Sequence, residues 1–484
     1  MKRRDFLKTI TLGTAAFAVA PAGHPLSADN GLADSFNGTI VLGRPTDCCL
    51  AVNVLSNELL EAYFEYGTQA GIYTDRTPAS TLEAGVPRED VIAYLQPSTR
   101  YYYRVRFRSP GAGQFRNGPE YTFHTQRTPG SAFTFGIQGD SHLERRNAFD
   151  PDLYRRTLLT AASDAPDFYI LMGDDFSVDQ LSPQTVTAEP VAERYILQRP
   201  YLDLIAKCAP LFLVNGNHEQ AAGYLLDGTA NNVAVWAQNA RNRYYPQPAP
   251  DAFYTGNAQP VEHIGLLRNY YAWTWGDALF VVIDPYWPSA VPVDNVYGVD
   301  KKAGGGGGKT SDKWLITHGE AQYRWLRQTL EQSTAKWKFV FAHHVNGTGR
   351  GGVEVAGLYE WGGHNNNGAW EFDGKRPGWE MPIHQLMVQN GVTIFFQGHD
   401  HIFARQQLDG VIYQTTPYPA DPGYSLNNAD AYASGDKLPC TGYVRVTVSA
   451  SAVRVEYIRT FLPKDETAAQ VNGQVAYAYT VSVP

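Results

Sequence analysis

The stretch PLFLVNGNHE, Pro210 to Glu219, sets an apolar run directly against a cluster of polar residues. A short apolar run without alternation is typical of a strand that is buried on both faces of an α/β sheet. In such sheets, functional side chains gather beyond the carboxyl ends of the strands. The stretch therefore predicts a buried strand whose end delivers Gly216-Asn217-His218 and the following glutamate to a site.

The same pattern recurs after four other apolar runs, FTFGIQ, DFYILM, FVFA and VTIFFQ. The polar blocks that follow these runs are Gly139-Asp140-Ser141-His142, Gly173-Asp174-Asp175, His343-His344 and Gly398-His399-Asp400-His401. Helical stretches such as LYRRTLLTAA and EAQYRWLRQTL lie between several of the runs, which indicates an α/β domain. Asp, Asn and His are the oxygen and nitrogen donors that suit divalent Mn, Fe, Co or Zn. A single block would indicate a structural histidine, but five blocks at five strand ends predict a metal site.

The chain from residue 39 to residue 125 has a different texture. Short segments such as DVIAYL and TRYYYRVRF are separated by clusters of Gly, Pro, Asn and Asp, and residues alternate plainly from Tyr101 to Phe107. Strands at this spacing predict an all-β sandwich. The segment QRTPG, Gln126 to Gly130, is the expected linker to the α/β domain.

The blocks D-x-H, G-D, G-N-H-E, H and G-H-x-H, in this order, resemble the signature of the calcineurin-like metallophosphoesterase superfamily. The stretches FEYGTQAGIYT and LQPSTRYYYRV resemble the fibronectin type III-like domain that precedes the catalytic domain of purple acid phosphatases. The resemblance implies an α/β fold, a β-sandwich flanked by helices (αββα), preceded by an all-β fibronectin type III-like sandwich. We expect the fibronectin type III-like domain at 36–126, the metallophosphoesterase domain at 131–462 and a C-terminal extension at 463–484.

The resemblance also implies a role for each polar block. The first metal ion would be bound by Asp140, His142 and His401, the second by Asn217, His343 and His399, and Asp174 would bridge the two. His218 would touch the phosphoryl oxygen or protonate the leaving group. In purple acid phosphatases, a tyrosine three residues after the bridging aspartate gives the purple colour, and this chain has Ser177 there. We therefore expect no tyrosinate colour and less dependence on acid pH.

The implied activity is hydrolysis of phosphate monoesters by a hydroxide held between two divalent ions (Fe, Mn, Zn or Co), without a covalent intermediate. Phosphodiester hydrolysis at the same site is the alternative, and a non-catalytic periplasmic binding protein is a more remote one. Arg145, Arg146, Arg350 and Arg405 are candidate contacts of a small phosphorylated substrate, because guanidinium groups match phosphate oxygens. A solvated surface position is the alternative for each arginine, and His344 is a further candidate contact.

The N-terminus has the layout of a secretory signal. MKRRDFLK precedes the short apolar segment TITLGTAAFAVA and the small-residue site Leu26-Ser27-Ala28. Arg3-Arg4 with the following Phe-Leu-Lys resembles the bacterial twin-arginine signal. We expect residues 1–28 to direct the folded protein through the twin-arginine machinery to the periplasm or the medium, with no membrane association after cleavage. The net charge of −8 argues against nucleic acid as a stable partner.

Two other features call for an interpretation. The stretch AGGGGGKT, Ala303 to Thr310, is close in spelling to a phosphate-binding P-loop. It lacks a strand before it and a helix directly after it, so we interpret it as a surface loop. The four cysteines, Cys48, Cys49, Cys208 and Cys440, match no zinc-ligand spacing, and their disulfide state is left open.

Overall fold

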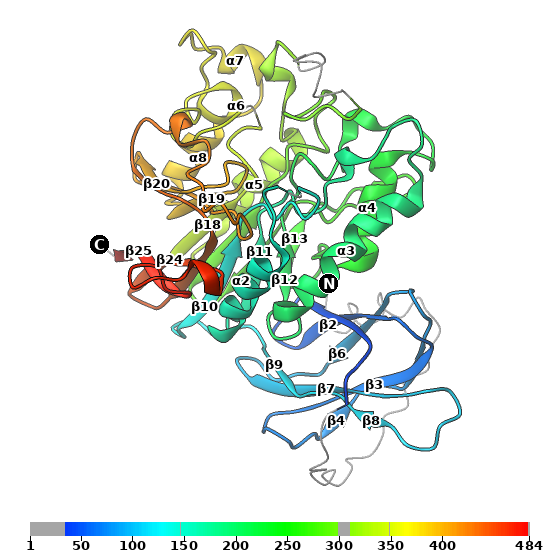
Figure 1. Ribbon diagram of the computed structural model, residues 1–484. Helices are drawn as coiled ribbons and strands as arrows, with labels where there is room; N and C mark the ends of the chain where they lie inside the picture. Colours follow the sequence, from blue (N-terminus) through cyan, green and yellow to red (C-terminus); the bar gives the residue numbers. More distant parts are fainter. Residues whose placement is uncertain (1–33, 146, 299–309, 348, 483–484) are drawn as a thin grey trace.

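The computed structural model of the chain describes residues 34–145, 147–298, 310–347 and 349–482. The expected signal at 1–28, Arg146 and the glycine-rich stretch up to Lys309 lie outside the described residues. The described chain forms an N-terminal β-sandwich and a larger domain of two sheets and several helices (Figure 1). No helix among these described residues is long and apolar enough to cross a membrane.

The N-terminal domain consists of two antiparallel sheets. The first has the order β1-β2-β6, with bounds Gly38–Gly43, Cys49–Ser56 and Arg88–Ala93. The second is built on β3 (Leu60–Gly67) and β7 (Arg100–Arg108), with β4 (Asp75–Arg76), β5 (Ser80–Leu82), β8 (Arg116–Asn117) and β9 (Tyr121–His124) beside them. Tyr101, Tyr103, Val105 and Phe107 of β7 point into one core with apolar residues of the first sheet. The all-β sandwich predicted from the alternation is confirmed.

The larger domain is built on two mixed sheets. The six-stranded sheet has the order β12-β11-β10-β23-β24-β25, with bounds Leu211–Leu213, Phe168–Leu171, Phe133–Gln138, Gly442–Val448, Ala452–Arg459 and Gln474–Ser482. The eight-stranded sheet has the order β13-β16-β17-β18-β19-β21-β20-β22, with bounds Thr255–Gly256, Tyr271–Trp275, Ala278–Val282, Trp337–Phe341, Ile394–Gln397, Val411–Thr415, Phe403–Leu408 and Asp436–Leu438. A small ribbon joins β14 (Pro260–Val261) to β15 (Gly265–Leu266). The sheets share an aromatic core, since the ring of Phe135 lies 5.2 Å from Phe280 and 5.8 Å from Phe339.

Helices cover the outer faces of both sheets (Figure 1). The helices α2 (Pro151–Ser163), α3 (Ala188–Ala206) and α4 (Val233–Tyr244) pack on the six-stranded sheet. The helices α5 (Glu320–Gln332), α6 (Tyr359–Gly362), α7 (Phe372–Lys375) and α8 (Ile383–Gln389) pack on the eight-stranded sheet. Asp150 caps the start of helix α2, because its side chain accepts hydrogen bonds from the N–H groups of Asp152 and Leu153. The αββα arrangement is confirmed.

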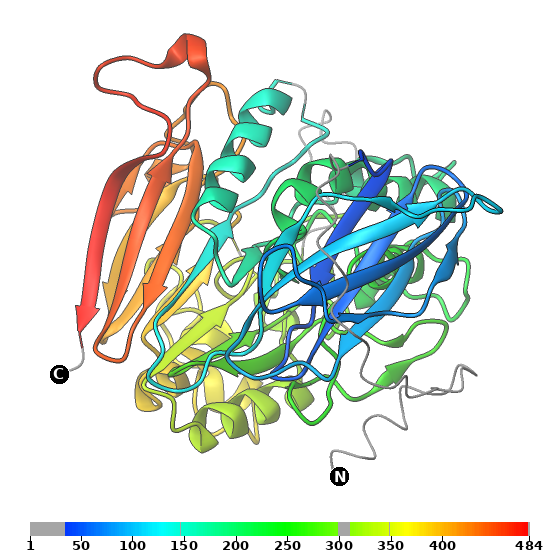
Figure 2. The same ribbon diagram turned by 90° about the horizontal axis from the view of Figure 1, so that it is seen from below.

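The residues after 462, which we expected to form an extension, add β25 to the edge of the six-stranded sheet. Strand β25 pairs antiparallel with β24 along its whole length, and it lies at the outer side of the domain in Figure 2. Residues 474–482 therefore form the edge of this sheet.

Polar contacts join the two domains. Arg199 of α3 is fully buried and donates hydrogen bonds to Thr39 Oγ1 at 2.8 Å and to Asn53 Oδ1 at 2.9 Å, both in the sandwich. The backbone N–H of Ile40 donates to Asp203 Oδ1 of α3 at 2.7 Å. A buried guanidinium that lost these acceptors would be costly, so the network ties the sandwich to the larger domain.

Candidate metal centre

The polar blocks follow β10, β11, β12, β18 and β19. Strands β10, β11 and β12 are parallel to one another, and β18 is parallel to β19. Parallel strands present their carboxyl ends at the same edge of a sheet, so each sheet brings its own blocks together there. The blocks of the two sheets then meet across the domain, where Asp140 after β10 contacts the residues that follow β19.

The backbone at this meeting point is held in an uncommon conformation. His142, Asp174, His399 and His401 have φ values of 42°, 60°, 66° and 57°. Side-chain-bearing residues rarely adopt the left-handed region, at a cost of order 1–3 kcal/mol each, and do so mainly at functional sites. Four of the seven residues that we expect to bind metal therefore occupy positions where the surrounding contacts outweigh backbone strain.

Two glycines leave room for the carboxylates of Asp174 and Asp140. A Cβ atom on Gly216 would lie 2.2 Å from Oδ1 of Asp174, and one on Gly398 would lie 2.7 Å from Oδ1 of Asp140. Real Cβ atoms essentially never come so close, so a side chain at either position would displace the carboxylate beside it. The glycines in the blocks thus allow side chains from different strands to converge.

The first group of donor atoms comes from Asp140, His142 and His401, whose donor atoms lie within 4.8 Å of one another. Oδ2 of Asp140 is 3.0 Å from Nε2 of His401 and 3.7 Å from Nε2 of His142. Nδ1 of His142 lies 3.2 Å from Oε1 of Glu144 and 3.3 Å from Oγ of Ser177. These contacts fix the ring and leave its Nε2 buried, with no hydrogen-bond partner among the described residues.

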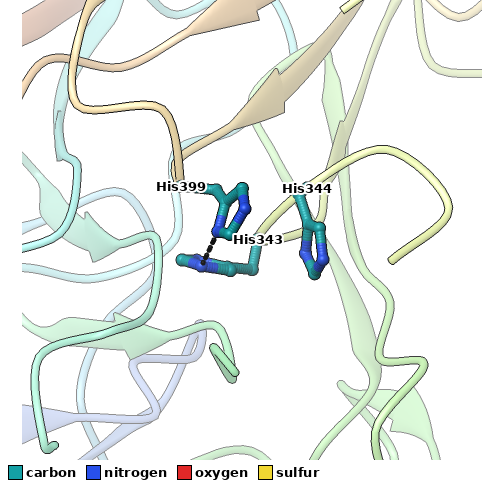
Figure 3. Close-up of side chains that lie close together, drawn as sticks. All are labelled: His343, His344 and His399. Carbon is teal, nitrogen blue, oxygen red and sulfur yellow. Dashed lines mark hydrogen bonds between the residues drawn. The ribbon is translucent and has the colours of Figure 1, made fainter. Parts of the chain in front are cut away.

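The second group comes from Asn217, His343 and His399 together with Asp174. Nε2 of His343 lies 3.1 Å from Oδ1 of Asn217 and 3.2 Å from Nδ1 of His399, the contact marked in Figure 3. Nδ1 of His343 lies 2.8 Å from the carbonyl oxygen of Met172, to which it donates. That hydrogen bond sets the tautomer and turns the lone pair of Nε2 toward the other donors.

Asp174 stands between the two groups. Its Oδ2 is 3.0 Å from Nε2 of His343 and 3.8 Å from Nε2 of His142. Its Oδ1 accepts the backbone N–H of His218 at 2.8 Å. Burial alone would raise the pKa of the Asp174 carboxyl, but His343 and His218 hold it well below its usual range. An ionised carboxylate among buried imidazole nitrogens, of which Nε2 of His142 and Nε2 of His399 have no hydrogen-bond partner among the described residues, is an environment that suits divalent cations, so these residues fit metal ions.

His218 is held on both sides of its ring. Its Nδ1 lies 2.9 Å from Oδ2 of Asp179, which also accepts from the side-chain amide of Asn295 at 2.8 Å. Its Nε2 lies 3.2 Å from an Nη atom of Arg145 and 3.7 Å from Oδ2 of Asp174. The carboxylate of Asp179 therefore orients the imidazole, and Nε2 faces the space beside the donor groups.

His344 is buried beside the second group, and one of its ring nitrogens lies within 4.8 Å of ring nitrogens of His343 and His399, so it is a further possible metal donor. Its ring lies near that of His399 (Figure 3), with centroids 4.4 Å apart. Its Nδ1 lies 3.1 Å from the hydroxyl of Tyr286. Burial and the neighbouring His343 lower the pKa of His344 to about 3. His344 is therefore neutral at physiological pH, and its Nε2 has no hydrogen-bond partner among the described residues.

The candidate arginines have different surroundings. Arg145 reaches His218, as described above. Arg350 instead donates to the carbonyl oxygen of His399 at 2.7 Å and to Oδ1 of Asp400 at 2.9 Å, so it holds the loop after β19. Arg405 lies in β20 with its guanidinium 4.8 Å from the ring centroid of Tyr479 in β25. The structure thus brings Arg145 to His218, holds Arg350 against the backbone and the aspartate beside His399, and places Arg405 over Tyr479.

Several residues that support the site were not singled out from the sequence. Glu219 accepts backbone N–H groups from Gly216 at 2.8 Å and from Asp175 at 2.9 Å, which joins two of the loops. Asp400 accepts the hydroxyl of Tyr432 at 2.6 Å and the N–H of residue 351 at 2.8 Å. Glu219 and Asp400 belong to the polar blocks themselves, so their position in the sequence could have indicated a role at the site. Asp179 lies outside the blocks, and no sequence pattern indicates that it contacts His218.

The chain is similar to known proteins in sequence and in fold. A model of the calcineurin-like phosphoesterase family matches residues 133–403. No curated protein matches the sequence. Among solved structures, the fold is similar to that of PhoD, at 13% identity and a TM-score of 0.61, covering 94% of this chain and 92% of that one. Weaker similarities are to GAP50, the anchor in the inner membrane complex of Plasmodium (12% identity, 73% and 89% covered, TM-score 0.36), and to a predicted phosphoesterase from Streptococcus pneumoniae (10% identity, 73% and 99% covered, TM-score 0.25).

Proposed function

Because this chain belongs to the calcineurin-like phosphoesterase family and is a metal-dependent phosphoric ester hydrolase, we propose that it cleaves phosphate monoesters at a centre of two divalent ions. The observation that supports the two-ion centre is the position of Asp174, whose Oδ2 faces His142 on one side and His343 on the other. A single carboxylate between two donor groups is what a two-ion site needs.

The residues of each group would hold one ion. Asp140, His142 and His401 would hold the first, Asn217, His343 and His399 the second, and Asp174 would be shared. Two bound divalent ions would neutralise charge on the phosphoryl oxygens and make a water molecule nucleophilic at neutral pH. The donors are oxygen and imidazole nitrogen, which supports Fe, Mn, Zn or Co as the metal.

His218 would protonate the leaving group. With Nδ1 held by Asp179, its Nε2 is the nitrogen that can carry a proton to the departing oxygen. In this structure Nε2 accepts from Arg145, so Arg145 must release it when substrate binds. The released guanidinium would then be free to pair with a phosphoryl oxygen, for which its planar donors are suited. His218 would thus act on the leaving group, and Arg145 would bind the phosphoryl group.

Parallel turnover of p-nitrophenyl phosphate and bis(p-nitrophenyl) phosphate tests the substrate class. The proposal predicts a higher kcat/KM for the monoester, and a higher value for the bis-ester would make the protein a diesterase. The variant Asp174→Asn is the matched control, because it keeps the size of the side chain but loses the charge shared by both donor groups. It should hydrolyse neither ester, and any rate that persists in it comes from a contaminant.

We also propose that residues 1–28 export the folded protein to the periplasm or the medium. The support is the twin-arginine pattern at Arg3 and Arg4, followed by a short apolar segment. Replacing both arginines by lysine keeps the positive charge and should leave the protein in the cytoplasm. Fractionation of cells that express the two forms checks this, and equal export of both would contradict the twin-arginine route.

A further inference from the structure

Two adjacent thiols, Cys48 and Cys49, lie where the turn of residues 46–49 leads into β2 of the sandwich. Oγ1 of Thr46 is 3.7 Å from Sγ of Cys48 and 3.1 Å from Sγ of Cys49. Neighbouring side chains of a regular strand point to opposite faces. Here both sulfur atoms approach the same hydroxyl group, so the turn brings them to one side.

The turn that does this is tightly bonded. Oγ1 of Thr46 accepts the backbone N–H groups of Cys48 at 3.1 Å and Cys49 at 2.9 Å. The N–H of Thr46 donates to the carbonyl oxygen of Cys49 at 2.8 Å. Three hydrogen bonds across four residues fix the backbone, and the convergence of the two thiols is therefore a property of the fold.

A small cavity adjoins Cys49, but not Cys48, at the junction of the two domains. Its volume is about 20 Å³, and its polar lining comes from Arg44, Thr46 and Cys49 of the sandwich and from Asp251 and Tyr254 of the larger domain, beside the apolar Leu50, Ala51 and Val91. A cavity needs roughly 10–15 Å³ to hold one water molecule, so this one admits a species of atomic size.

We propose that Cys48 and Cys49 form a binding site for a soft divalent cation, such as Cd²⁺ or Zn²⁺, at the domain junction. Thiolates are soft ligands and prefer such cations. The oxygen and nitrogen donors of the catalytic centre have no such preference for soft cations. Each thiol loses its proton as its sulfur binds, so one cation replaces two protons. The site is distinct from the catalytic centre in both ligand chemistry and position.

The surroundings make one thiol easy to ionise. The Cys48 thiol, and to a lesser degree Thr46 and Arg44, lower the pKa of Cys49 to about 7 against the opposing effect of burial. Both cysteines are partly exposed, so a cation can reach them from solvent. Cys208 is the matched comparison, because it is partly exposed too but burial raises the pKa of its thiol.

Titration of the reduced, metal-loaded protein with Cd²⁺ tests this site. Thiolate-to-cadmium charge transfer absorbs in the ultraviolet, and the oxygen and nitrogen donors of the catalytic centre give no such band. We expect the band to saturate at one cation per chain, to be lost in Cys48→Ser and in Cys49→Ser, and to persist in Cys208→Ser. Turnover of p-nitrophenyl phosphate should be unchanged in the three variants, which shows that each is folded.

Absence of the band in wild-type protein whose thiols are reduced would overturn the proposal. So would a band that survives in both Cys48→Ser and Cys49→Ser, since the thiolates would then lie elsewhere. A band lost equally in Cys208→Ser would show binding by scattered thiols and would also refute the site.

Discussion

Replacing Asp179 by Asn should slow the reaction, and we expect the whole effect to come from the changed hydrogen bonding of His218. The carboxylate of Asp179 lies 2.9 Å from Nδ1 of His218, and its substitution removes one charge-assisted contact. Such contacts contribute about 1.5–3 kcal/mol, which corresponds to a rate loss of roughly 10–100-fold. Loss of His218 itself, in His218→Ala, should cost about 10²–10⁴-fold, as for a positioned acid. Because Asp179 acts through the imidazole, the double variant should be no slower than His218→Ala.

The assay compares two monoesters that differ in leaving group. A p-nitrophenolate departs without a proton, whereas an alkoxide needs one, so both variants should lose more rate on an alkyl phosphate than on p-nitrophenyl phosphate. Metal content should stay at the wild-type value, and Asp164→Asn, which breaks a contact with Arg445 outside the site, should change neither rate. Losses that multiply in the double variant would show that Asp179 acts independently. Equal losses on both esters would mean that His218 stabilises phosphoryl charge, and loss of metal would make it a ligand.

Three further changes have definite expected outcomes. Asn217→Ala should abolish turnover and lose about one ion per chain by elemental analysis, and retained activity with two bound ions would reject its assignment. Alanine at both Lys309 and Thr310 should leave kcat nearly unchanged, and a collapse in a folded protein would show that the glycine-rich stretch binds phosphate. Burial alone would raise the pKa of Glu360, but His318 holds it below its usual value, so Glu360 stabilises the fold above its unfolded pKa and this contribution is lost on acidification through the folded value. Urea unfolding should therefore depend less on acid pH in Glu360→Gln than in wild type.

The positions of the candidate ligands followed from a local rule. Each apolar run of the larger domain became a strand, and the polar residues directly after it had to lie at the end of that strand. Since β10, β11 and β12 are parallel, their ends meet without any further information. The sequence also predicted the alternating strands of the sandwich, because an alternating segment such as Tyr101 to Phe107 can bury only one of its faces.

Long side chains and distant partners did not follow such a rule. Arg350 and Arg405 lie close in sequence to the polar blocks, but a guanidinium on a flexible stem can reach several partners, and packing decides among them. Arg350 contacts the loop of Asp400, and Arg405 lies over Tyr479, which comes 74 residues later (479 − 405). The partnership of Asp179 with His218 likewise depends on how two loops pack.

The most direct test of the two-ion centre is a titration of metal-free protein with Mn²⁺, in which bound metal and turnover of p-nitrophenyl phosphate are measured on the same samples. If Asp174 is shared by two ions, turnover should rise only as binding approaches two ions per chain. Asp174→Ala should bind fewer ions and remain inactive at every concentration. Full turnover at one ion per chain, or two tightly bound ions in Asp174→Ala, would contradict the shared centre.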